Sequence, residues 1–296
     1  MSAFREYTGI SPSPSSVRDV PTVSVIVTIY NITDLFGRCV AGLWAQNYPA
    51  DKTEIIVADD GSIDNWRSVL PNLELKFKTQ VVTQQHHGYR LASLKNLGMR
   101  ASTGEVILFL DGDMIPPPHW MNAHVTALQT NSILTVSIGA RRFIDSRDLG
   151  VSDILSDPHI VSRLPDVRSI SNWLQLEDRR IPELRRLTNH PAPYHLFHGC
   201  NAAFFRALAL RSGLMDEVFN GYWGYEDTEF AYRMWRGGGQ FKWSTDATAY
   251  HQENEITALS DRNYGDQNNF ELACRLIPGF REFKLRLRDS RRVPWW

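Results

Sequence analysis

Two carboxylates, Asp111 and Asp113, stand one residue apart where an apolar run ends, shortly before the prolines 116–118. Two like charges this close repel each other, so the pattern requires either full hydration or a counter-ion. The stretch alone fits a solvated turn in which Gly112 supplies the bend. It also fits a divalent cation site, because Mg²⁺ and Mn²⁺ use oxygen ligands and bridge a few protein carboxylates to substrate phosphates.

A second acidic pair, Asp59 and Asp60, ends another apolar run and is followed by Ser62 and Asp64. Ser62 or Asp64 could cap a helix. Asp60 could instead accept a hydrogen bond from an imide N–H such as uracil N3. The sequence contains neither G-x-G-x-x-G after its first apolar run nor G-x-x-x-x-G-K-[ST], which disfavours dehydrogenases and P-loop enzymes. A bound diphosphate would then be neutralised by a metal.

Two basic residues, Arg90 and Lys95, open a helical pattern after the third apolar run. They fit either a solvated basic face or a contact with a nucleotide. The neighbouring His86 and His87 are interpreted as exposed loop residues, without a role in the site.

Glu226 and Asp227 begin a helical pattern directly after an aromatic, glycine-containing loop with Tyr222, Trp223 and Tyr225. The helix dipole favours acids in a first turn, which could explain the pair without any chemistry. The aromatic flank indicates more, since such rings form platforms on which sugars stack. A carboxylate beside such a platform could act as a general base.

His251 ends the last expected strand. A lone histidine usually has a structural role. Together with the acidic pair it could complete a site of mixed nitrogen and oxygen ligands, which favours Mn²⁺ over Mg²⁺.

The elements that must position these residues alternate between strand and helix over the first hundred or so residues. Strands buried on both faces indicate a parallel sheet, and the alternation predicts an open α/β sheet with helices on both faces. Ligands bind such sheets beyond the carboxyl ends of the strands, where the acids lie. The expected strands are 23–30, 53–62, 79–85, 104–113, 132–144, 197–206 and 240–252. The expected helices include 34–46, 90–102, the stretch after Glu226, and one near 65–73 that breaks at Pro71. Residues 145–195 are expected to form helices and loops of an acceptor-facing wall.

The composition of the 296 residues fits one large domain, with 43% hydrophobic residues and a net charge of −1, which gives no reason to expect nucleic-acid binding. Three dispersed cysteines, no signal-peptide pattern and no long apolar run predict a cytoplasmic protein. We expect a flexible lead-in (1–20), one domain (21–265, with nucleotide-binding half 21–115 and acceptor-binding half 116–265) and a basic helical tail (266–296). The tail either packs on the domain or docks on the inner face of an anionic membrane through Trp295 and Trp296.

Five stretches, in order, resemble the inverting glycosyltransferases of family 2, which have the GT-A fold. They are VTIYN, VADDGSID, GYRLASLKNLGMRASTGEVILFLDGDM, NGYWGYEDTEFAYRM and AYHQENE. The second half is similar to the bacterial chondroitin-polymerase type and to polypeptide and galactosyl transferases. The resemblance covers about residues 22–255 and implies a mostly parallel central sheet flanked by helices.

The resemblance also implies roles for the matching residues. Thr28, Tyr30, Asp60 and Arg90 would hold the uridine, with Asp59 and Lys95 close by. Asp111 would contact the ribose or, through water, the metal, whose ligands would be Asp113 and His251. Asp227 would be the base, and Glu226 would hold a sugar beside Tyr222, Trp223 and Tyr225.

These implications predict a transferase that uses Mn²⁺ or Mg²⁺ and moves a sugar from a UDP-sugar to an acceptor hydroxyl with inversion. A glycan, a natural product or a peptide could be the acceptor. A nucleotidyltransferase, which would release pyrophosphate, and a non-catalytic nucleotide-sugar-binding protein are the alternatives.

Overall fold

The computed structural model describes residues 20–129, 132–165, 178–252 and 259–291. Residues 1–19 of the predicted lead-in, as well as Trp295 and Trp296, lie outside this range. The strands are β1 (Val23–Ile29), β2 (Thr53–Asp59), β3 (Lys78–Thr83), β4 (Val106–Asp111), β5 (Met114–Ile115), β6 (Thr135–Ile144), β7 (Asn201–Phe205) and β8 (Gln240–Gln252). The helices are α1 (Thr33–Trp44), α2 (Leu70–Glu74), α3 (Leu91–Ala101), α4 (Trp120–Leu128), α5 (Val151–Ser156), α6 (Ile160–Arg163), α7 (Ile181–Leu184), α8 (Arg206–Ser212), α9 (Glu226–Arg236), α10 (Leu259–Leu276) and α11 (Phe280–Arg291).

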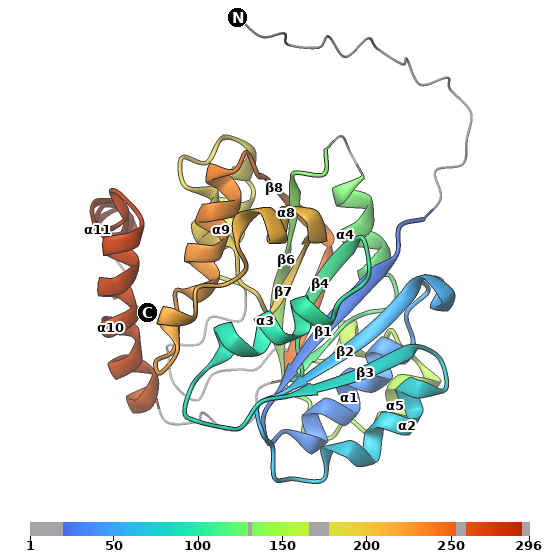
Figure 1. The fold of residues 1–296 in the computed structure, drawn as a ribbon. Coiled ribbons are helices and arrows are strands. Elements are labelled where there is room, and N and C mark those ends of the chain that lie inside the picture. The colour runs from blue at the N-terminus through green and yellow to red at the C-terminus, as the bar shows by residue number, and fades with distance from the viewer. Residues whose placement is uncertain (1–19, 130–131, 166–177, 253–258, 292–296) are drawn as a thin grey trace, which may run out of the picture.

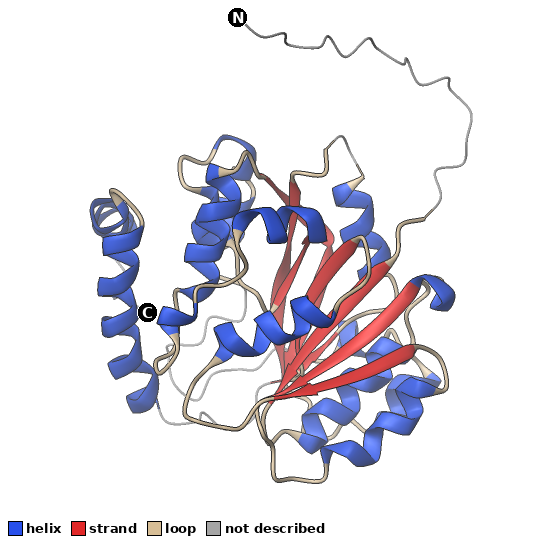
Figure 2. Cartoon of the chain, in the orientation of Figure 1, coloured by secondary structure: helices blue, strands red, loops and turns tan. Residues whose placement is uncertain are grey.

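The strands form one sheet in the order β3-β2-β1-β4-β7-β6-β8-β5 (Figures 1 and 2). Strands β3, β2, β1 and β4 are parallel neighbours, whereas β7 runs antiparallel to β4 and β6. The register aligns Thr28 with Asp111 and Ile29 with Asp59. The carboxyl ends of β1, β2 and β4 therefore meet at one edge, as the sequence predicts.

Helices cover both faces of the sheet (Figure 2). Val25 and Val27 of β1 belong to the core under α1, α2 and α4, while Ile26 belongs to the core under α3, α8 and α9. This alternation follows from the two-residue period of a strand, and burial of each such side chain contributes about 1.5–3 kcal/mol. Gly98 lets α3 approach β1, since a Cβ at this position would overlap the side chain of Ile26.

The predicted strands and long helices are present, but the expected break at Pro71 is wrong. A short 3₁₀ helix, η2 (Trp66–Val69), leads into α2, and Pro71 lies in the first turn of α2. Proline is tolerated there because the first amide groups of a helix have no partner within it.

Helices α10 and α11 form a hairpin beside α9 (Figure 1). Ala273, Ile277 and Phe280 bury their side chains in the same core as α9. Helix α10 continues across position 265, where the sequence predicts the tail to begin. Among the described residues, the structure has no helix with the length and apolar character needed to cross a bilayer.

Candidate active site

The carboxyl ends of β1 and β4 are joined by side chains as well as by the sheet. Thr28 donates a hydrogen bond from Oγ1 to Oδ1 of Asp111, at 3.0 Å. The backbone N–H of Gly112 donates to the carbonyl of Thr28, which turns the chain away from the strand. Burial raises the pKa of Asp111 to about 6, the nearby charge of Asp113 adds to this, and Lys95 opposes it.

Asp113 meets His251 where β5 pairs with β8. Nε2 of His251 lies 3.4 Å from Oδ2 of Asp113. The backbone N–H and the side-chain amide of Gln252 both donate to the carbonyl of Asp113, at 3.0 and 3.2 Å. Oδ1 of Asp113 is buried and accepts no hydrogen bond from a described residue. A carboxylate oxygen without a donor, next to an imidazole, fits a divalent cation such as Mn²⁺.

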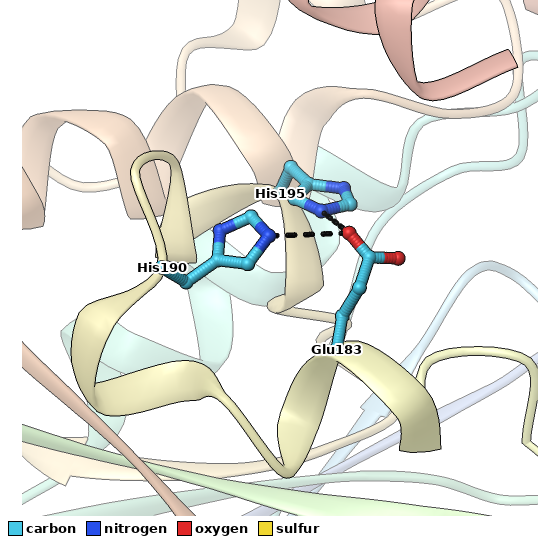
Figure 3. A group of neighbouring side chains, drawn as sticks. All are labelled: Glu183, His190 and His195. Atoms are coloured by element: carbon cyan, nitrogen blue, oxygen red, sulfur yellow. Dashed lines mark hydrogen bonds and ion pairs between the residues drawn. The ribbon is translucent and has the colours of Figure 1, made fainter. Parts of the chain in front are cut away.

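Asp111 does not join Asp113 and His251 as a third close ligand. Within the described ranges, the set of three candidate ligand atoms that lie within 4.8 Å of one another belongs to Glu183, His190 and His195 (Figure 3). Both histidines bond Oε2 of Glu183 through Nε2, at 3.2 and 2.8 Å. The N–H of Ala192 donates to Nδ1 of His190, so the hydrogen-bond network assigns the ring proton to Nε2. That nitrogen acts as a donor to Glu183, so the set is a hydrogen-bonded anchor and not a preformed metal site.

Asp60 is the centre of a second polar group at the end of β2. Its two oxygens bond Nε2 of Gln84 at 2.6 Å and Nδ1 of His86 at 2.8 Å. The His86 ring stacks on Tyr30, with 4.1 Å between ring centres and 9° between planes. Gln84 was not named from the sequence, whereas His86 was interpreted as an exposed loop residue without a role in the site; the structure has His86 exposed but bonded to Asp60. By contrast, Asp59 accepts the backbone N–H of Ser62 and closes the turn after β2.

Arg90 lies at the N-cap of α3 and donates through Nη2 to the carbonyl of Gln85, at 3.0 Å. Its Nε is buried and has no hydrogen-bond partner among the described residues. The guanidinium of Arg90 therefore keeps one buried donor without a partner among the described residues.

Lys95 and Asp227 form an ion pair close to Asp111, at the end of β4. Nζ of Lys95, on α3, lies 3.1 Å from Oδ1 of Asp227, and the Lys95 side chain is 1% exposed. Burial disfavours the charged ammonium, but Asp227 and Asp111 outweigh it and raise the pKa of Lys95 above its usual value. The N–H of Gly199 donates to Oδ2 of Asp227 at 2.7 Å. Asp227 is thus fixed by two donors.

Glu226, the first residue of α9, differs from its neighbour Asp227. Burial raises the pKa of Glu226 to about 8, and the charge of Asp227 adds to this effect. Oε2 of Glu226 is buried and has no hydrogen-bond partner among the described residues. The pair therefore combines a protonated acid with a carboxylate bound to Lys95, and such divergent environments separate the roles of neighbouring acids.

The aromatic loop before α9 presents two of its three rings. Tyr222 and Trp223 are 48% and 43% exposed. Tyr225 has a positive φ of 68° and contacts Phe270 and Phe280 of the hairpin.

The loop is held from behind by Asn269 of α10. Its Nδ2 lies 2.9–3.1 Å from the carbonyls of Phe219, Tyr222 and Gly224. Asn269 was not predicted, because its distance along the chain gives no signal for this contact.

Comparison with known proteins shows the family of the chain. Residues 24–211 match the family described as Glycosyl transferase family 2. The chain is 31% identical to the chondroitin synthase of Escherichia coli, over 92% of this chain and 41% of that protein. It is 32% identical to the hyaluronan synthase of Pasteurella multocida, over 97% of this chain and 30% of that protein. The chain thus spans less than half the length of these relatives.

Solved structures with a similar fold are more distant in sequence. The Staphylococcus aureus TarS 1–349 complex with UDP-GlcNAc matches with a TM-score of 0.58 and 17% identity, over 81% of this chain and 60% of that one. The mannosyltransferase PcManGT from Pyrobaculum calidifontis, in complex with GDP-Man and Mn²⁺, matches with a TM-score of 0.54 and 20% identity, over 84% and 61%. At these identities the likeness concerns the fold alone.

Proposed function

Because the chain belongs to glycosyl transferase family 2, we propose that it moves a sugar from a UDP-sugar to an acceptor hydroxyl, with a divalent cation and with inversion. The predicted family, the GT-A fold and the enzyme class are confirmed. The UDP-sugar donor, the divalent metal and the inversion of configuration are the parts of the proposal that family membership does not establish. The observation that carries them is the placement of Asp113 with His251 and of Asp227 with Lys95 around the same strand ends.

Asp113 and His251 would hold the cation, and Mn²⁺ suits their mixed oxygen and nitrogen donors. When bound, such a cation supplies positive charge that stabilises the departing diphosphate. The proposal is supported by the buried oxygen of Asp113 that lacks a donor.

Thr28, Tyr30, Asp60 and Arg90 would hold the uridine. A uracil N3–H that bonds Asp60 must compete with Gln84 and His86, which already donate to this carboxylate. The stacked rings of Tyr30 and His86 offer a flat surface of the kind on which a base can lie. Asp111, held by Thr28, would face the ribose.

Asp227 would act as the general base. It accepts the proton as the O–H bond of the acceptor breaks, and the acceptor oxygen bonds to the anomeric carbon. The bond from that carbon to the diphosphate breaks on the opposite face and its electron pair leaves with UDP, so the configuration inverts. Lys95 and the N–H of Gly199 hold the carboxylate in place, which is the positioning that such catalysis needs. Protonated Glu226 would donate a hydrogen bond to a sugar hydroxyl.

The acceptor is proposed to be a carbohydrate hydroxyl that lies against Tyr222 and Trp223, since both relatives named above are synthases of glycans. Natural-product and peptide acceptors, the cytoplasmic location and membrane contact through the basic tail stay predictions.

A donor screen tests the proposed function. UDP-glucose, UDP-galactose and their N-acetylated and uronic forms are incubated with Mn²⁺ or with EDTA, and release of UDP is measured. We expect Mn²⁺-dependent UDP release that Asp227→Asn abolishes while UDP binding persists. Release of pyrophosphate, or turnover that EDTA leaves unchanged, would contradict the proposal.

A further inference from the structure

Gln252, the last residue of β8, bonds the backbone of one proposed metal ligand and follows the other directly in the chain. Its backbone N–H donates to the carbonyl of Asp113 at 3.0 Å, and its side-chain Nε2 donates to the same oxygen at 3.2 Å. The preceding residue is His251, whose Nε2 lies 3.4 Å from Oδ2 of Asp113. One residue is therefore tied to both members of the pair that would bind the cation.

The side-chain amide of Gln252 is buried, and every hydrogen-bonding position on it is filled. Nε2 donates to the carbonyls of Leu35 and Asp113, at 2.9 and 3.2 Å. Oε1 accepts from Nη1 of Arg38 at 3.2 Å and from Oγ of Ser146 at 3.4 Å. An amide has two donor hydrogens and two acceptor lone pairs, so these four contacts account for all of them and identify which end is the nitrogen. Rotation of the side chain would break several bonds at once.

The partners of this amide come from separate parts of the chain. Leu35 and Arg38 lie on α1, and Ser146 lies in the turn after β6. Nε of Arg38 also donates to the carbonyl of Leu149 at 2.6 Å, which ties that turn to α1. The bonds of Gln252 thus connect Asp113 to a helix and a turn whose positions are already fixed relative to each other.

Asp113 needs such support because the strand that follows it is short. Strand β5 consists of two residues, Met114 and Ile115, and lies at the edge of the sheet beside β8. The register of β5 with β8 contains two residue pairs. The bonds from Gln252 extend the contact with β8 by one residue, to the proposed ligand itself.

We propose that Gln252 is a positioning residue for the cation, which acts through Asp113 and His251 while its own amide stays bonded to protein groups. The inference rests on the proposed function and deepens it by assigning the residue that orients the metal-binding pair. Groups that orient metal ligands typically contribute about 10- to 100-fold to metal affinity. The reason is that ligands held in place lose less conformational freedom when the metal binds.

Gln252→Met tests the inference, because methionine is also long and unbranched but lacks the amide. Electron paramagnetic resonance measures Mn²⁺ binding in the presence of UDP, and calorimetry measures UDP binding in EDTA. We expect Mn²⁺ to bind the variant about 10- to 100-fold more weakly, with the UDP affinity in EDTA unchanged. Because both ligands remain present but less well placed, a higher Mn²⁺ concentration should recover the gain in UDP affinity that the metal provides.

Gln46→Met is the matched control. Gln46 is also buried, and its Nε2 donates to the carbonyls of Gly42 and Pro117, at 2.9 and 2.7 Å. Its Oε1 accepts the backbone N–H of Met121 at 3.0 Å. The control variant loses a similar set of buried hydrogen bonds at the other end of α1. It should lower the melting temperature as Gln252→Met does, but leave the Mn²⁺ affinity unchanged.

Three outcomes overturn the inference. They are a Gln252→Met variant that binds Mn²⁺ as the wild type does, an equal loss of Mn²⁺ affinity in Gln46→Met, and an equal loss of UDP affinity with Mn²⁺ and in EDTA. The last two would show a general loss of structure and no specific effect on the cation. A wild type that binds no Mn²⁺ in the presence of UDP contradicts the proposed function instead, so the two failures are distinguishable.

Discussion

Lys95→Met should destabilise the protein, and the loss should grow with pH. The ammonium is the partner of Asp227 and also lowers the pKa values of Asp111 and Glu226. Removal of one partner of a buried ion pair costs about 3–5 kcal/mol. Because the Asp227 side chain is 19% exposed, contact with solvent reduces this cost. We therefore expect Lys95→Met to lower the free energy of unfolding by about 2–4 kcal/mol near pH 8.

The pH dependence follows from the protons bound in each state. The raised pKa of Lys95 keeps its ammonium charged across the acid and neutral range, and this stabilising charge is lost only as the pH rises through the folded-state value. In the variant, the pKa values of Asp111 and Glu226 rise further. The folded variant then holds more protons than the unfolded chain, so its stability falls as the pH rises. The loss should therefore be smaller near pH 5 than near pH 8.

Thermal unfolding of the ligand-free protein at several pH values measures this effect. A loss of this size lowers the melting temperature of a domain this large by about 3–7 °C. Lys78→Met is the matched control, because Lys78 pairs with Glu54 but is 70% exposed, and we expect less than about 1 kcal/mol. An unchanged melting temperature for Lys95→Met, or the same loss of stability near pH 5 and pH 8, would refute the idea that the Lys95 ammonium balances the negative charges of the surrounding carboxylates.

Three further predictions concern the same site. Turnover should fall as the pH rises through about 8, where Glu226 loses its proton, and Glu226→Gln should remove that decline in the pH–rate profile. Gly199→Ala should lower kcat about 10- to 100-fold with little change in UDP affinity, because the new Cβ would overlap the ends of Lys95 and Asp227, and steady-state kinetics with calorimetry would measure both. Asn269→Leu should cost about 1–3 kcal/mol in denaturant unfolding and reduce transfer more than UDP binding, since three loop carbonyls lose their donor; full transfer activity would contradict its positioning role.

The sequence predicted the parts of the fold that depend on local pattern. Apolar runs that end in acids located the edge where Thr28, Asp59 and Asp111 come into register, because parallel strands share the direction of their ends. Pro71 misled the prediction, since proline both interrupts helices and opens them, and only the preceding turn decides which.

Contacts over long sequence distances could not be predicted in the same way. Asp60 could be named as a site residue, but its bonds to Gln84 and His86 depend on how the loop after β3 folds back. The sequence placed Tyr225 in an aromatic loop. In the structure its backbone has a positive φ and its ring contacts Phe270, and neither feature could be predicted from the neighbouring residue types. The raised pKa of Glu226 likewise arises mainly from burial, and the residues next to it in the sequence do not show how deeply its side chain is buried.

The contact between Asn269 and the aromatic loop has a consequence for protein engineering. The loop and the helix that holds it both lie beyond residues 24–211, the part that matches the family, and about 45 residues separate the two along the chain. A chimera that borrows the loop alone to acquire new acceptor specificity would leave its supporting amide behind. Grafts should therefore transfer residues 219–227 together with the α10–α11 hairpin as one cassette.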